Sequence, residues 1–89
     1  MISATLVDTN TYEVVVSGDV ETRHRVHMTQ DYYKQLSGGT VTHEWVLIQS
    51  FRFLLEREPN TANLAEFDLP VIAQYFPEYE DTITERLRQ

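Results

Sequence analysis

The stretch from residue 40 to residue 59 constrains the fold of this chain more than any other segment. It contains the only tryptophan, two of the four phenylalanines and the densest run of aliphatic residues in an 89-residue sequence. Its apolar side chains recur at helical spacing and cover more than half of the circumference of the helix they predict. Such a helix must be covered on nearly all sides, either by its own chain or by a second copy.

Local signals set the limits of this helix. Thr42 is its predicted N-cap, because a threonine hydroxyl can accept a hydrogen bond from a first-turn amide. Val41 and Val46 stand at the spacing of a hydrophobic staple, which fixes how the chain enters a helix. Pro59 is expected to end the helix, since proline cannot continue one.

The N-terminal third predicts β-strands. Apolar and polar residues alternate with a period of two over much of residues 2–28, which is typical of half-buried strands. Turn-forming residues at positions 8–11 and 17–19 divide the segment into three short strands. Strands joined by such short turns form an antiparallel meander.

The remaining segments predict shorter helices. A helix begins after Thr29 and ends at the Gly38-Gly39 pair, where glycine can take the left-handed conformation of a helix C-terminus. Beyond Pro59 we expect a helical turn that contains Leu64 and Phe67, and then helices over residues 69–76 and 77–87. The prediction is a single α+β domain over residues 1–89: a three-stranded antiparallel meander packed against a long central helix and shorter C-terminal helices.

The composition disfavours several classes of protein. The chain has no cysteine, and its 14 acidic and 7 basic residues give a net charge of −7, which repels nucleic acid. No apolar run approaches the roughly 20 residues that span a bilayer, so no membrane segment is expected. The lack of cysteine suits a reducing cytoplasm, and the first residues lack the features of a signal peptide, so a cytoplasmic protein is expected.

The sequence also lacks a recognisable catalytic or metal motif. His43-Glu44 resembles the start of a zinc-protease helix, but the second histidine of that motif is replaced by Leu47. His24 and His27 are three residues apart on a strand, so they point to opposite faces and do not chelate one ion. We therefore predict that the protein is not an enzyme and has no cofactor.

A cationic row on the third predicted strand is the first candidate interaction site. Arg23, Arg25 and His27 share the face opposite Val26, and we expect them to point outward. One interpretation is a solvated face that pairs with Glu13 and Glu21 across the meander.

The other interpretation of this row is DNA binding. Strand 22–28, a short helix, a glycine-containing turn and an apolar helix together resemble the ribbon-helix-helix repressors. The resemblance implies a dimeric DNA-binding regulator in which Arg23, Arg25 and His27 enter the major groove and Thr42 and His43 hold a phosphate. The chain departs from that family by its short first helix, its two preceding strands and its acidic charge.

The tyrosines are the second candidate interaction site. Five tyrosines and four phenylalanines exceed what a small core requires, and tyrosine is favoured at interfaces. We expect Tyr32, Tyr75 and Tyr79 not all to be buried, which indicates a protein partner or a homodimer. A core that uses all the aromatic residues is the other interpretation.

Four strings of residues resemble a family of small uncharacterised bacterial proteins, and the likeness as a whole extends over most of residues 12–88. These strings are residues 22–26 (TRHRV), 51–59 (FRFLLEREP), 67–72 (FDLPVI) and 75–80 (YFPEYE). The resemblance implies a bacterial cytoplasmic protein that folds as a self-contained domain, and it assigns no activity and no catalytic residues. The sequence therefore predicts a small non-enzymatic protein of interaction or regulatory type.

Overall fold

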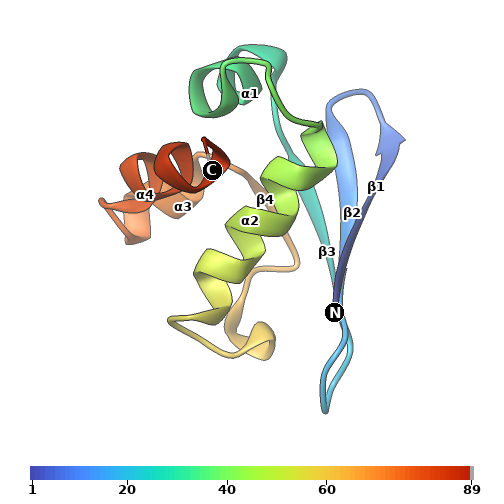
Figure 1. Cartoon of the computed structure of the whole chain (residues 1–89). Coiled ribbons are helices and arrows are strands. Elements are labelled where there is room, and N and C mark those ends of the chain that lie inside the picture. Colours follow the sequence, from blue (N-terminus) through green and yellow to red (C-terminus); the bar gives the residue numbers. More distant parts are fainter. Residues whose placement is uncertain (89) are drawn as a thin grey trace.

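The computed structural model describes residues 1–88 as a sheet of four strands with helices on one side of it (Figure 1). In chain order the elements are β1 (Ile2–Asp8), β2 (Thr11–Val16), β3 (Thr22–His27), α1 (Gln30–Ser37), α2 (His43–Leu55), the 3-10 helix η1 (Asn60–Ala62), β4 (Glu66–Asp68), α3 (Val71–Tyr75) and α4 (Tyr79–Leu87). The predicted α+β class is confirmed.

The sheet has the order β1-β2-β3-β4, and its last strand runs parallel to its neighbour. Strands β1, β2 and β3 pair antiparallel as predicted, with Val14 opposite Ala4 on one side and His24 on the other. The prediction of a wholly antiparallel, three-stranded sheet is wrong, because residues 66–68 form a strand and not part of a helical turn. Three residues are too few for a period-two pattern, and β4 is formed by its pairing with β3.

Capping determines where the helices begin and end. The Thr42 hydroxyl accepts a hydrogen bond from the Trp45 amide at 3.0 Å, and the Thr29 hydroxyl caps α1 in the same way. Gly38 ends α1 with a φ of 67°, in the left-handed region that glycine enters without a steric penalty. All three predictions are confirmed.

Helix α2 is shorter than the apolar stretch that predicted it. It covers 13 residues and ends at Leu55. The Arg57 amide donates to the Leu54 carbonyl, three residues back, at 2.9 Å, so the last turn tightens and the chain leaves the helix before Pro59. The residue that precedes a proline is disfavoured in the helical region, which accounts for the early end.

The core has two layers of contacts, one on each side of α2. In Figure 1, α2 runs between the sheet and the pair α3 and α4. Phe51 faces the sheet, with its ring centroid 5.2 Å from that of His24 and 6.1 Å from that of Phe67. Phe53 faces the other way, with its ring 5.2 Å from that of Tyr79. The chain therefore covers the apolar helix by itself.

Ion pairs at the surface connect the end of α2 to α4, and they make stability depend on pH. Arg86 donates to the Glu56 carboxylate at 2.6 Å, and Arg57 lies 3.5 Å from the same carboxylate. The hydrogen bond from Arg86 is the main cause that lowers the pKa of Glu56. A carboxyl group with a lowered folded-state pKa stabilises the fold above its unfolded pKa, and this contribution is lost as the pH falls through the folded value.

We therefore expect the stability of the Glu56→Gln variant to fall less steeply with decreasing pH than that of the wild type. The difference should occur below about pH 4.3, the ordinary pKa of glutamate. The free energy of unfolding, measured by urea denaturation between pH 3 and pH 7, checks this. Glu85→Gln is the control. Glu85 is an exposed residue of α4, and its replacement removes one negative charge, as the replacement of Glu56 does. Identical pH profiles for the two variants would contradict the prediction.

Candidate functional site

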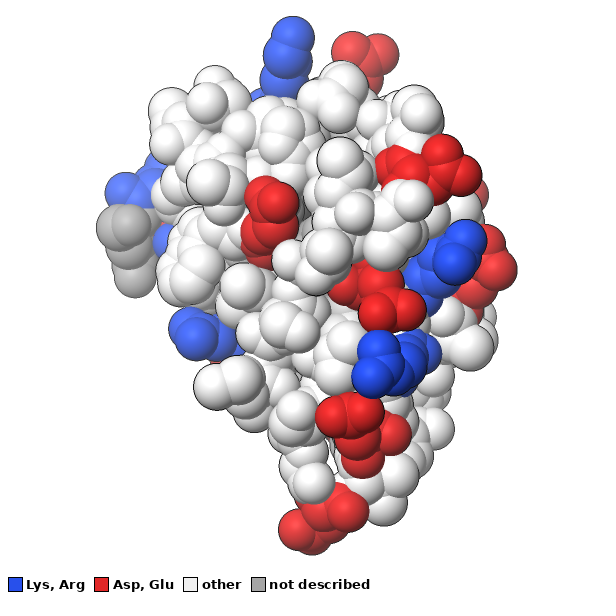
Figure 2. Space-filling view, turned by 90° about the vertical axis from the view of Figure 1, so that its right-hand side faces the viewer, with Lys and Arg blue, Asp and Glu red and all other residues white. Residues whose placement is uncertain are grey.

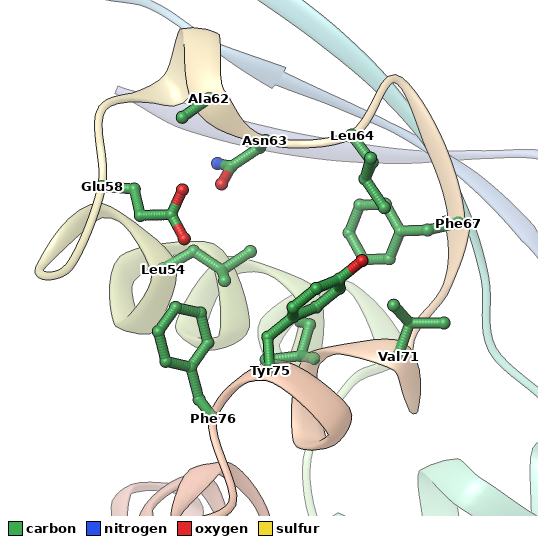
Figure 3. A pocket seen from close by; sticks show the side chains of 10 residues that line it. Leu54, Glu58, Ala62, Asn63, Leu64, Phe67, Val71, Tyr75 and Phe76 are labelled. Carbon is green, nitrogen blue, oxygen red and sulfur yellow. The ribbon is translucent and has the colours of Figure 1, made fainter.

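The candidate functional site is an apolar groove between the end of α2, η1, β4 and α3, called the Tyr75 groove below. It has a volume of about 220 Å³ (Figure 3). Its floor contains the buried side chains of Leu54, Phe67 and Ile72. Leu64 and Tyr75 lie at its mouth and are 49% and 67% exposed.

One end of the groove is polar. Glu58 and Asn63 lie close together at the end opposite Val71 (Figure 3). The Glu58 side chain is half-buried, and within residues 1–88 its carboxylate has no ion-pair partner. The amide nitrogen of Asn63 is buried and has no hydrogen-bond partner among the same residues. A cationic group placed at this end of the groove would gain an ion-pair partner in Glu58.

A buried histidine on β3 positions the groove wall. His24 Nδ1 donates to the Leu64 carbonyl at 2.7 Å, so in the neutral ring Nε2 accepts from the Thr22 hydroxyl at 2.8 Å. The Asn60 side-chain amide donates to the same hydroxyl and to the Val20 carbonyl. These bonds tie residues 60–64 to the sheet, and they hold Asn63 and Leu64 over the groove.

The predicted cationic row lies on the sheet face turned away from α2. Arg23 and Arg25 are exposed, whereas His24 and Val26, which alternate with them, are buried. Arg23 lies 3.1 Å from Glu13 and 3.5 Å from Glu21, the two acidic residues considered as partners from the sequence.

His27 lies 2.8 Å from Glu66, which belongs to β4. Arg25 has no ion pair in the described part of the chain. In this row, Arg23 and His27 are thus each paired with an acidic side chain, and Arg25 lies between them without an ion pair among the described residues.

The topology is incompatible with the ribbon-helix-helix arrangement. In that arrangement the strand that carries the cationic row pairs with the same strand of a second copy. Here β3 is paired with β2 on one edge and with β4 on the other, so it has no edge for a second chain. His43 stacks on Tyr33 with ring centroids 3.7 Å apart and contacts Gln30, so it too is engaged within the chain.

Only one of the three candidate tyrosines lies at the surface. The Tyr32 hydroxyl donates to the Glu80 carboxylate at 2.8 Å, and the fully buried Tyr79 shares a 2.7 Å hydrogen bond with Ser50. Burial raises the pKa of both phenols. Tyr32 and Tyr79 therefore attach α4 to α1 and α2, and Tyr75 alone is free for contacts outside the chain.

Sequence reasoning missed most of the groove. The sequence predicts an interaction role for Tyr75 and a helical turn at Leu64, and no pattern in it marks Glu58 or Asn63 as part of a site. The signal that could have found them is the number of apolar residues in short segments after Pro59, which a single helical turn does not bury. Their assembly depends on β4, which the sequence pattern does not predict.

Comparisons and searches for other kinds of site gave no assignment. Within residues 1–88, no group of three or more histidine, aspartate or glutamate side chains could hold a metal ion. None of the helices described is long and apolar enough to cross a membrane. No family model, curated protein or solved structure matches this chain. The candidate function therefore rests on geometry.

Proposed function

We propose that this protein is a non-enzymatic interaction domain of regulatory type that binds a segment of a partner protein in the Tyr75 groove. The observation that carries the proposal is the pair Leu64 and Tyr75, two exposed large side chains at the mouth of an apolar hollow. Aromatic residues beside a pocket are typical of the few positions that carry most of the binding energy at protein interfaces.

The size of the groove favours a side chain as its occupant. Pockets for drug-sized molecules have volumes of about 300–1,000 Å³, whereas this groove has about 220 Å³. Among the described residues that line it, only Glu58 and Tyr75 have titratable side chains. That pair contains no nucleophile with an adjacent base, which favours binding over catalysis.

The charge of the groove favours a basic partner segment. The Glu58 carboxylate lies beside the apolar floor without a cation of its own, and the whole chain carries a net charge of −7. A lysine or arginine next to an apolar anchor could place its stem on the floor and its charge near Glu58. The resemblance to small bacterial proteins and the lack of cysteine support this role in a bacterial cytoplasm.

Selection of peptides from a random display library on the immobilised protein tests this proposal. We expect the enriched peptides to share an apolar residue next to a lysine or arginine. Their affinity should fall at least tenfold for Tyr75→Ala, because the variant removes the aromatic contact at the mouth. Glu58→Gln should weaken the binding of the basic peptides and leave the affinity for neutral analogues unchanged.

Val20→Ala is the matched control for this experiment. Val20 is 57% exposed on the turn between β2 and β3 and does not line the groove. Peptides that bind the wild type, Val20→Ala and Tyr75→Ala equally well would place the binding surface elsewhere. Enrichment of no common motif would argue against a peptide-binding groove.

A further inference from the structure

The two edges of the sheet differ in how well they are protected. The β4 edge is only three residues long, and it carries Glu66 and Asp68 on either side of Phe67. The β1 edge is seven residues long, and its only charged side chain is that of Asp8 at its end, while residues 2–7 contain neither a charged side chain nor a proline. Proteins normally shorten or charge an exposed edge strand, because its unpaired backbone groups attract another strand. On β1 such features are confined to the end of the strand, where Asp8 and a shift in register between Leu6 and Asp8 lie.

The hydrogen-bond pattern identifies the backbone groups that β1 leaves free. Met1 and Ser17 form two backbone hydrogen bonds with each other. The amides and carbonyls of the odd-numbered residues of β1 therefore point toward β2. Antiparallel bonding alternates along a strand. The amides and carbonyls of Ile2, Ala4 and Leu6 therefore point to the open edge, on the side of the molecule that no other described strand occupies (Figure 1).

We infer that two copies of this chain pair through β1, antiparallel and in register about Ala4. The sequence of the strand is nearly symmetric about that residue: Ile2 and Leu6 are apolar, Ser3 and Thr5 carry hydroxyls, and Ala4 lies at the centre. Pairing about Ala4 sets Ile2 opposite the Leu6 of the second copy and Ser3 opposite its Thr5. Both kinds of cross-strand pair are favourable.

The register also satisfies the free backbone groups. Ala4 faces its own copy as a hydrogen-bonded pair, and Ile2 and Leu6 exchange both bonds with the second chain at each end. Leu6 is 56% exposed, and its side chain is on the face covered by α2, so the pairing buries apolar surface as well. Because β4 is protected, the assembly closes as a two-fold dimer with a continuous eight-stranded sheet.

The surface around the edge is compatible with a second copy. Figure 2, which faces the β1 side of the molecule, shows mostly uncharged atoms in the centre, with an isolated acidic side chain there and separate basic side chains towards the left. Basic and acidic side chains gather on the right-hand side, and acidic side chains lie at the lower tip. Each copy carries a charge of −7, so salt should strengthen the dimer by screening the repulsion between the copies.

Sedimentation equilibrium over a range of concentrations tests the inference. We expect the mass to approach twice 10.4 kDa and the dimer to be tighter at 0.5 M salt than at 0.05 M. Ala4→Pro should be monomeric and folded, because the Ala4 amide donates to no bond within the sheet and proline is tolerated on an edge strand. Tyr75→Ala should remain dimeric, since the groove is at the opposite edge, and this separates the dimer from the proposed function.

A single cysteine tests the register and covers the case in which Ala4→Pro does not fold. The chain has no cysteine, so Ala4→Cys introduces the only thiol. Hydrogen-bonded antiparallel pairs lie about 5.5 Å apart at Cα, within disulfide range. Under mild oxidation Ala4→Cys should form a linked dimer, whereas Val20→Cys should not. A monomer at all concentrations, a larger assembly, or equal linkage of the two variants would overturn the inference.

Discussion

Replacing Phe51 with alanine should lower the free energy of unfolding by about 3–5 kcal/mol, the usual cost for a buried phenylalanine. Phe51 is fully buried, and its ring contacts His24 on β3 and Phe67 on β4. Its removal would leave a cavity where the central helix meets the two strands that form the parallel pair. Urea denaturation followed by circular dichroism measures the loss.

Phe51→Leu is the control for this prediction. A leucine keeps most of the apolar volume, so this variant should cost less than the alanine variant. A loss below about 1 kcal/mol for Phe51→Ala would contradict the packing of α2 on β3 and β4, since mutations at exposed sites cost this little or less.

The Tyr79→Ala variant should lose a similar amount, about 3–5 kcal/mol, because a large aromatic side chain leaves the other side of the core. Tyr79 packs edge-on against Phe53, and its hydroxyl bonds to Ser50. Tyr79→Phe keeps the ring and removes only the hydroxyl. Ser50 keeps its bond to the Val46 carbonyl, so the phenylalanine variant should lose only about 1 kcal/mol.

The pair of variants also separates a structural role from a binding role. If Tyr79 attaches α4 to α2, both variants change the unfolding curve, and the folded fraction of each binds the selected peptides normally. Loss of peptide binding without loss of stability would instead make Tyr79 a contact with the partner. This is the role that the sequence analysis considers for it. Thermal denaturation and peptide affinity, measured on the same preparations, provide the two readouts.

Local patterns predicted much of the fold. The period of two located β2 and β3, and threonine and glycine signals located both ends of α1 and the start of α2. Each of these depends on interactions within a few residues, such as the bond from the Trp45 amide to the Thr42 hydroxyl. Such interactions form in the same way whatever the rest of the chain does, which is why sequence reasoning recovers them.

The groove depends on contacts between residues distant in the chain. His24 and Leu64 are 40 residues apart, yet one hydrogen bond between them positions the wall of the groove. His27 and Glu66 meet in the same way across β3 and β4. Short segments such as residues 66–68 have no periodicity of their own, so the partner strand decides their conformation.

The apolar stretch at residues 40–59 shows where the two kinds of information divide. The sequence by itself determined that this stretch forms a helix and that most of its surface must be buried, because spacing and hydrophobicity are local properties. Only the tertiary structure decided what covers it, how early it ends, and which strand edge stays open. Those outcomes depend on pairing between distant segments: β4 closes one edge of the sheet with acidic residues, and β1 leaves the other edge open with a charged side chain only at its end.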